Sequence, residues 1–423
     1  MKISPGVSER DPIQTTAMNS QRFSWRDQKL HLSLNSVRLS IAIESSNPPS
    51  VYNYDLTGRP WNIYKAGKIY QRGLDGKIVS KWSHPESGRG RRWLEPDEAD
   101  HLVQEASQLA AQIFSDIQNS ELSLKIDSEG RLLNILDTAG SFAGRRAAED
   151  SERFNEIYTP VGILPPDQYQ AVLLQATEGC SFNSCTFCEF YKGRRFHIKS
   201  KQAFKQHARA VYEFLGPGLS LRRTIFLGDA NALVIPTDQL LSIMEISGEI
   251  FDVESLGGFY AFLDGFSGDH KSQEEFERLK HAGLERIYIG LESGHDPLLR
   301  FLNKPGDSHD VLSAVKKMKA GGIPVGIIVL LGAGGEKYAR GHVEDTVNLI
   351  NQMHLNMDDQ VYFSELIELE GMGYASDAFT QSVLPLDRTQ ILEQAEMIQK
   401  ALKFDASHGT PHISRYDIRE FVY

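Results

Sequence analysis

An alternation of apolar runs with amphipathic helical stretches organises the chain from about residue 171 onward. Six apolar runs predict strands, at 171–177, 223–228, 256–263, 286–292, 324–332 and 360–366. Helical stretches separate them, at 201–215, 237–250, 272–282, 308–320 and 338–353. Near-continuous apolar strands joined by helices are typical of a parallel sheet. Six units are too few to close an eight-fold barrel, so we predict an α/β fold, a partial (β/α)6 TIM-type barrel.

The N-terminal part of the chain follows a different pattern. Alternation over 30–43 predicts strands, and the aromatic runs after it predict hairpins, with Asp75–Gly76 as the clearest turn. An amphipathic helix should begin at Pro96 and end near Asn119, followed by a strand pair near 122–126 and 132–136. Residues 1 to about 25 are expected to be a flexible lead, 87–96 a solvated basic loop or an anion contact, and 138–165 a linker.

These patterns predict two domains. Residues 1–160 would form an accessory α+β module with its linker, and residues 161–423 the partial barrel with a C-terminal substrate-pocket segment.

Composition narrows the class of protein. The chain has 423 residues, 41% of them hydrophobic, which is enough for a sizeable core. The net charge of −11 disfavours nucleic acid as a general partner, although a local basic patch can lie within an acidic total. No apolar run is long enough to span a membrane, and the N-terminus lacks the apolar stretch of a signal peptide. We therefore expect a cytoplasmic protein.

One stretch carries the clearest chemistry, the segment QATEGCSFNSCTFCEFYKGR at 175–194. It contains Cys180, Cys185 and Cys188, which are the only cysteines of the chain. Three thiolates can bind three irons of a [4Fe–4S] cluster and leave the fourth iron open to a small ligand. Ferredoxin clusters and structural zinc sites instead take four protein ligands.

Other interpretations of the three cysteines remain open. They could be small buried residues, but their neighbours are Gly, Ser, Asn, Thr and Glu, which is the composition of a loop. An odd cysteine count without a secretory signal disfavours a disulfide. A zinc site with His197 as the fourth ligand is also possible.

The stretch resembles the radical S-adenosylmethionine (SAM) superfamily. That family carries three cysteines after the first barrel strand, commonly as CxxxCxxC with an aromatic residue before the last cysteine. Here the spacing is CxxxxCxxC, one residue longer, with Phe187 at the aromatic position. The resemblance covers about residues 165–410 and implies a [4Fe–4S] cluster, SAM as a cofactor, and an electron donor such as flavodoxin or ferredoxin.

Polar motifs follow the strand ends, where α/β barrels gather their chemistry. Glu292, in the segment GLESG, ends a buried strand and needs a polar partner. The resemblance assigns the segment after the second strand to the methionine part of SAM and the GLESG segment to SAM contact. Asp264 could bind a ribose hydroxyl, and Val329 and Leu331 could flank the adenine. The predicted cofactor-binding residues are Phe187, Gly228, Asp229, Asn231, Asp264, Glu292, Ser293, Val329 and Leu331.

A small-molecule substrate is expected to bind near the C-terminal segment, where the candidates are Glu365, Glu368, His408, His412 and Arg415. The predicted reaction is reductive cleavage of SAM to a radical that acts on this substrate. The sequence leaves open a 3-amino-3-carboxypropyl transfer, a non-catalytic Fe–S or zinc scaffold, and a zinc hydrolase, although no HExxH motif is present.

Overall fold

The computed structural model describes residues 19–44, 48–84, 88–122, 129–368 and 371–423. The described chain divides into two compact units. One contains the chain up to Arg153 with residues 216–221 and Val422, and the other contains the remaining residues from Phe154 onward. Each unit is described by itself below.

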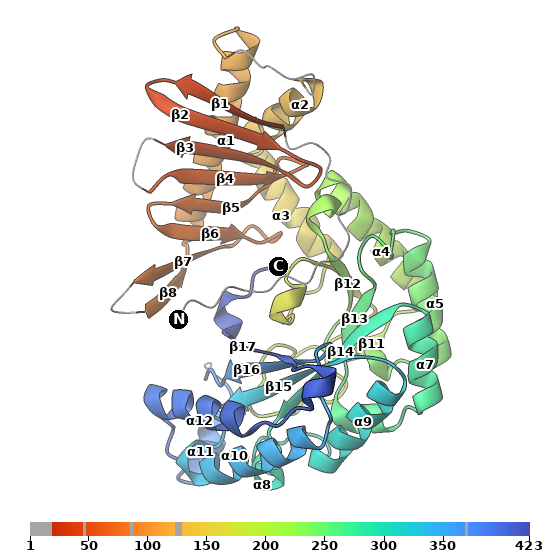
Figure 1. Cartoon of the computed structure of the whole chain (residues 1–423). Coiled ribbons are helices and arrows are strands. Elements are labelled where there is room, and N and C mark those ends of the chain that lie inside the picture. The colour runs from red at the N-terminus through yellow and green to blue at the C-terminus, as the bar shows by residue number, and fades with distance from the viewer. Residues whose placement is uncertain (1–18, 45–47, 85–87, 123–128, 369–370) are drawn as a thin grey trace. The chain divides into compact units, whose positions relative to one another are not determined.

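The first unit is built on an eight-stranded antiparallel sheet in which each strand pairs with the next one along the chain (Figure 1). Leucines at alternate positions of β2, such as Leu30 and Leu32, are buried, and the residues between them are half-exposed. The strands are β1 (Asn19–Trp25), β2 (Gln28–Leu34), β3 (Arg38–Glu44), β4 (Ser50–Asp55), β5 (Pro60–Lys65), β6 (Lys68–Arg72), β7 (Ile78–His84) and β8 (Gly88–Trp93).

Helices cover one face of this sheet and complete its core. Helix α1 (Pro96–Gln118) places Ala106, Ala110 and Ile113 on the sheet, and α2 (Glu129–Gly140) adds further apolar side chains. The Tyr54 hydroxyl, at the end of β4, donates to the Ala106 carbonyl at 2.7 Å. Each fully buried aliphatic side chain contributes about 1.5–3 kcal/mol. Helix α3 (Arg145–Ile157) follows α2.

Four expectations for this part of the chain are corrected. Residues 19–25 form strand β1 and not a flexible lead, because they pair with β2 along their whole length. Residues 132–136 belong to helix α2, since Leu132, Ile135, Leu136 and Ala139 are buried at helical spacing. Most of the other predicted strand, 123–126, lies outside the described residues. The predicted linker 138–165 contains helix α3, whose charged residues surround the single buried Phe154.

The basic segment after β7 is the fourth correction. It forms strand β8 and not a solvated loop, because it pairs with β7 through Val79–Trp93, Lys81–Arg91 and the registers between them. A Cβ at Gly90 would lie 2.4 Å from the Trp82 ring, so the glycine lets this ring lie across the strand. The turn predicted at Asp75–Gly76 is confirmed, with Gly76 at a φ of 86°.

The second unit is a parallel sheet of seven strands with helices on its outer side, as Figure 1 shows for α4, α5, α7 and α9. The predicted partial barrel is confirmed. Its sheet order is β9 (Ala171–Gln175), β12 (Thr224–Gly228), β13 (Phe259–Phe262), β14 (Leu284–Glu292), β15 (Val325–Leu331), β16 (Gln360–Glu365) and β17 (His412–Tyr416). All six predicted strands are present. The sequence pattern missed β17, which joins the sheet beside β16.

The helices of this unit agree with the predicted stretches and add shorter ones. The predicted stretches correspond to α4 (Lys201–Leu215), α5 (Thr237–Gly248), α7 (Gln273–His281), α9 (Ser308–Ala320) and α10 (Gly335–Asn351). The additional helices are α6 (Gly265–Asp269), α8 (Asp296–Phe301), α11 (Gly373–Thr380) and α12 (Arg388–Ala401). A two-stranded ribbon, β10 (Thr177–Glu178) with β11 (His197–Ile198), closes the base of the cysteine loop. No helix among the described residues is long and apolar enough to cross a membrane.

Candidate functional site

The three cysteines lie together on one cavity of about 210 Å³ in the barrel unit. The cavity is also lined by residues that follow the ends of β12, β13, β14 and β16, which is the edge where parallel α/β folds place their chemistry. From the predicted set, the structure brings to this cavity Cys180, Cys185, Cys188, Phe187, Asn231, Asp264, Glu292 and Glu365.

Hydrogen bonds within the cysteine loop and to the end of α8 fix the loop. Asn183, at a φ of 50°, donates its side-chain amide to the carbonyl of Tyr191 at 2.8 Å, and its backbone N–H donates to the Cys180 sulfur at 3.4 Å. The Thr186 N–H donates to the Leu302 carbonyl at 3.0 Å, which ties the loop to the end of α8. These bonds hold the loop in one conformation.

Asp229 and Arg194 form a brace at the base of this loop. The Asp229 carboxylate accepts from the backbone N–H of Gly179, next to Cys180, and from the Gln175 amide, both at 3.2 Å. Arg194 lies 3.6 Å from this carboxylate and donates to the Pro160 carbonyl at 2.6 Å. Burial raises the pKa of Asp229, and its hydrogen bonds and Arg194 oppose that rise. Asp229 therefore positions the loop and does not line the cavity.

The thiols lie in a partly desolvated environment. Burial raises the pKa of Cys185 to about 11 and also raises the pKa of Cys188. A thiol with such a pKa is protonated at neutral pH, and a bound cation reverses this because the metal ligand is the thiolate.

The three sulfurs are not gathered around the position of one metal ion in this structure. Three thiolates on one tetrahedral zinc ion, each at 2.3 Å, lie about 3.8 Å from one another. In the part of the chain that the structure describes, the group of three potential ligands within 4.8 Å consists of Asp307, His309 and Asp310, and the cysteines do not gather so closely. His197 pairs with Glu178 at 3.6 Å and does not line the cavity.

Glu292 ends β14 in an unusual conformation. Its φ is 59°, in the left-handed region, and the β14–β15 pairing shifts register between Gly290 and Glu292. Holding a non-glycine residue there costs roughly 1–3 kcal/mol. The side chain of this residue forms a buried ion pair, in which the Lys304 ammonium donates to the Glu292 carboxylate at 2.9 Å.

Lys304 is the main residue that sequence reasoning missed. It follows α8, lines the cavity, and lies 5.9 Å from the centre of the Phe187 ring. Burial alone would lower its pKa, but Glu292 and Cys185 outweigh this effect and raise the pKa. Lys304 therefore stays charged beside the cysteine loop. A lysine in a loop 12 residues after Glu292 carries no local pattern that marks its role.

Asn231 and Asp264 form a second polar pair on the cavity wall. The Asn231 amide donates to Asp264 and, at 3.0 Å, to the Ser181 hydroxyl of the cysteine loop. The Asp264 N–H returns a bond to the Asn231 amide oxygen at 3.2 Å, and the Asp264 carboxylate also caps α6 through Ser267. Asp264 thus serves as a helix cap and still faces the cavity.

Several predicted residues lie elsewhere. Val329 and Leu331 lie on the opposite side of β15 from Ile328 and Leu330, which line the cavity. Ser293 is buried, accepts from the His295 N–H at 3.0 Å and bonds His342 Nδ1 at 2.7 Å, outside the cavity. Gly228 is the last residue of β12 and does not line the cavity.

The C-terminal candidates are mostly outside the cavity as well. Glu368, His408, His412 and Arg415 are exposed and do not line it. Their neighbours do, since Tyr416, Ile418 and Ser364 contribute to the wall. Alternation along β17 explains the difference, because Arg415 and Tyr416 point to opposite sides of the strand.

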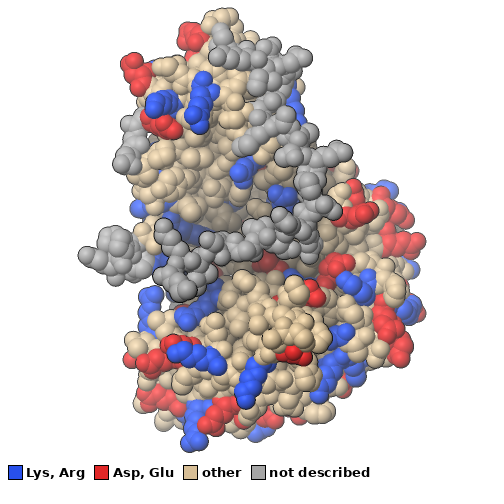
Figure 2. All heavy atoms as spheres, in the orientation of Figure 1, with Lys and Arg blue, Asp and Glu red and all other residues tan. Residues whose placement is uncertain are grey.

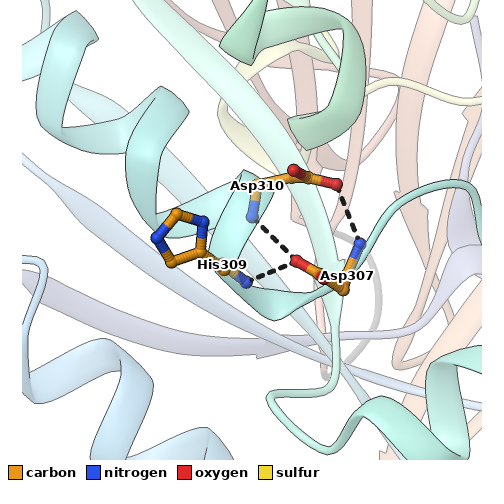
Figure 3. A group of neighbouring side chains, drawn as sticks. All are labelled: Asp307, His309 and Asp310. Carbon is orange, nitrogen blue, oxygen red and sulfur yellow. Dashed lines mark hydrogen bonds between the residues drawn. The ribbon is translucent and has the colours of Figure 1, made fainter.

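The cluster of Asp307, His309 and Asp310 has a structural explanation. It forms the start of α9, where the Asp307 carboxylate accepts from the N–H groups of His309 and Asp310, and the Asp310 carboxylate accepts from the Asp307 N–H (Figure 3). This is a capping box that satisfies the free N–H groups of a helix terminus.

Comparison with known proteins assigns this region to a family. Residues 174–350 match the sequence model of the Radical SAM superfamily. This part of the chain belongs to that superfamily, and the predicted cofactors, a [4Fe–4S] cluster and SAM, are those of the domain.

The individual relatives are distant. The heme chaperone HemW of Bacillus subtilis (strain 168) is 22% identical over 243 residues, which are 56% of this chain and 60% of that protein. Coproporphyrinogen III oxidase (HemN) from Escherichia coli matches with a TM-score of 0.41 and 12% identity, over 59% of this chain and 56% of that one. Methylornithine synthase (PylB) matches with a TM-score of 0.39 and 12% identity, over 62% of this chain and 81% of that one. The chain thus spans about 60% of the length of HemW.

Proposed function

We propose that the protein is a radical SAM enzyme that cleaves SAM reductively and uses the resulting radical on a small-molecule substrate. One observation carries this proposal: the three cysteines converge with Glu292, Lys304, Asn231 and Asp264 on a single cavity at the strand ends of a radical SAM domain. Cys180, Cys185 and Cys188 would hold a [4Fe–4S] cluster, which would supply the electron that breaks a carbon–sulfur bond of SAM.

Different residues of the cavity bind the cluster and the SAM carboxylate. Cys180, Cys185 and Cys188 bind the cluster, and the Asp229–Arg194 brace fixes the loop that carries them. The Lys304 ammonium has donors beyond its bond to Glu292, and a charged group beside the cysteines complements the SAM carboxylate.

Other residues of the cavity lining suit the nucleoside part of SAM. Asp264 offers a carboxylate to ribose hydroxyls, and Ile328 and Leu330 offer an apolar surface to the adenine ring. The remaining lining contains Tyr416, Ile418, Leu366, Ile367 and Met372, with Glu365 among them. We assign this part to the substrate. An apolar wall also excludes water, which protects a radical from side reactions. An electron donor such as flavodoxin or ferredoxin completes the reaction.

The test is anaerobic reconstitution with iron and sulfide, followed by reduction with dithionite in the presence of SAM and mass spectrometry of the products. We expect 5′-deoxyadenosine from the native protein, and none when all three cysteines are replaced by Ala. Ser184→Ala is a matched control, because this exposed hydroxyl in the same loop donates to the carbonyl of Phe182. Its product yield should equal that of the native protein.

Two other results would redirect the assignment. Methylthioadenosine in place of 5′-deoxyadenosine would show transfer of the 3-amino-3-carboxypropyl group. A bound cluster that leaves SAM intact would overturn the catalytic proposal in favour of a binding scaffold.

A further inference from the structure

The eight-stranded sheet carries a charge opposite to that of the whole protein. Residues 19–93 contain 13 Lys and Arg but five Asp and Glu, within a chain whose net charge is −11. Such an asymmetry between parts of one chain is typical of proteins that bind a polyanion. The basic segment at β8 is one part of this distribution, and β1 and β3 carry others.

Strand pairing assigns the outward-facing side chains of this sheet. The helices cover the face of Leu32, Ile41, Tyr52 and Ile63, so the residues between them face the other way. The basic residues on this outward face are Arg22, Lys29, His31, Arg38, Lys81, Arg89 and Arg91. Among the described residues, Glu44 is the acidic side chain exposed there, and it pairs with His31 at 3.2 Å.

Amides and hydroxyls form a row across the middle of this face. Cross-strand pairing aligns Ser33 with Ser40, Ser40 with Asn53, Asn53 with Asn62, and Asn62 with Gln71. Ser40 donates to Asn53 at 2.7 Å, and Lys81 donates to Gln71 at 3.2 Å. These side chains are half-exposed, and each amide retains capacity for further hydrogen bonds.

Two aromatic rings stand on the same face. Tyr64 lies on β5 opposite Ile69 of β6, and Trp93, at the end of β8, is 43% exposed. Figure 2 shows scattered Lys and Arg side chains, a few Asp and Glu side chains and many uncharged ones in this part of the molecule. The face therefore combines cations, a polar row and accessible rings.

We propose that this sheet face binds single-stranded nucleic acid. Flat sheets recognise single strands by stacking bases on aromatic rings, by hydrogen bonds to base edges, and by Lys and Arg contacts to phosphates. All three components are present here. An anionic membrane would be matched by a basic amphipathic helix with an apolar face and not by a row of amides.

The experiment uses the full-length protein and a fluorescein-labelled 16-nucleotide RNA, its DNA equivalent, and the same RNA annealed to its complement. Fluorescence anisotropy is measured from 50 to 300 mM salt. We expect either single strand to bind more tightly than the duplex, with an affinity that falls steeply with salt. The ratio of RNA to DNA affinity shows which of the two is the natural ligand.

Variants separate stacking from charge. Trp93→Ala should weaken single-strand binding about ten-fold with an unchanged salt slope, because it removes a stacking ring and no charge. Arg22→Ala with Arg89→Ala should weaken binding and reduce the salt slope. The matched control is Arg92→Ala with Arg145→Ala, which removes the same charge from residues paired with Glu98 and Glu149. Its binding should stay within about two-fold of the native value.

Three results would overturn the proposal: no binding to either single strand at 50 mM salt, equal losses in the test and control pairs, or binding of the duplex as tight as that of the single strands. Stronger retention on vesicles containing phosphatidylserine than on the oligonucleotides would show a membrane surface instead. Tyr64→Leu serves as a second variant that removes an aromatic ring. Circular dichroism of each variant checks that a loss of binding is not caused by a loss of fold.

Discussion

At the scale of single residues, the Glu292–Lys304 pair is the least expected feature of the cavity. Both side chains are nearly buried, at 9% and 13% exposure. Removing one partner of a buried pair leaves an uncompensated charge, whereas removing both can be nearly neutral. The pair therefore makes a prediction about stability that is separate from catalysis.

We predict that Lys304→Met lowers the free energy of unfolding by about 3 kcal/mol and that adding Glu292→Gln restores most of it. Urea unfolding at pH 7 measures both. SAM binding by equilibrium dialysis should be weak in the single variant and stay weak in the double variant, because the ammonium is lost from both. Equal stability of the single and double variants would contradict the buried-pair interpretation.

The sequence identified the cysteines but not the residues that support them. Cys180, Cys185 and Cys188 are recognisable because three thiols in one loop have few other uses. Lys304 and Arg194 act through contacts with residues 12 and 35 positions away in the chain, which no local pattern records. Asp229 was identified as a site residue, but its contacts make it part of the loop brace and not of the cavity wall.

At the scale of elements, that brace joins the end of β12 to the cysteine loop. We predict that Asp229→Ala lowers the iron bound after reconstitution to less than half, although all three cysteines remain, because the Gly179 N–H loses its acceptor and Arg194 loses its carboxylate partner. Iron and sulfide analysis per protein measures this effect. Asp252→Ala, which removes an exposed carboxylate that accepts from Ser255, is the matched control and should bind iron normally.

Strand β15 shows why the sequence of a fully apolar strand does not reveal which of its side chains face the cavity. All seven of its residues are buried, so a period of two cannot show which side faces the cavity. The prediction chose Val329 and Leu331, and the structure places Ile328 and Leu330 there. Strands such as β9 and β12 were predictable because they are continuous buried apolar runs, whereas β17 has the same length but is half-exposed and carries no such run.

Gly326 marks the inner side of β15. A Cβ at this position would lie 2.4 Å from the ring of Tyr288, a cavity residue. We predict that Gly326→Ala lowers the free energy of unfolding by about 1–3 kcal/mol through overpacking. Gly130→Ala, where a Cβ meets nothing within 4 Å and the residue lies in helix α2, should not lower it. Similar urea midpoints for the two variants would show that Tyr288 moves aside freely.

At the scale of the whole molecule, two buried histidines link stability to pH. The backbone N–H of Gln175 donates to His207 Nε2 at 3.0 Å, and Nδ1 bonds the carbonyl of Ile157, which fixes a neutral ring. His342 is fully buried beside Ser293, with His295 nearby. Burial lowers the pKa of each to about 4. For His207 the positive charge of Lys199 adds to this effect, and Glu178 opposes it.

These depressed pKa values determine the direction of the pH effect. Between about pH 6.5 and 4 the unfolded chain binds protons at both histidines and the folded chain does not, so acid favours unfolding. The stabilisation is complete above pH 6.5 and is lost as the pH falls through this window, by on the order of 3 kcal/mol per histidine. Most carboxylates titrate below pH 5, so the range from pH 7 to 5 isolates the histidines.

We therefore predict that the free energy of unfolding, measured in urea, falls by about 2 kcal/mol or more per pH unit between pH 6 and 5. His207→Gln and His342→Gln should each remove about half of this slope, since neither side chain titrates there. His354→Gln is the control, because this histidine is exposed and should leave the slope unchanged. Two results would contradict this prediction: a free energy of unfolding of the native protein that does not change with pH, or a pH slope that both buried-site variants retain. Either result would show that His207 and His342 have no part in the acid sensitivity of the protein.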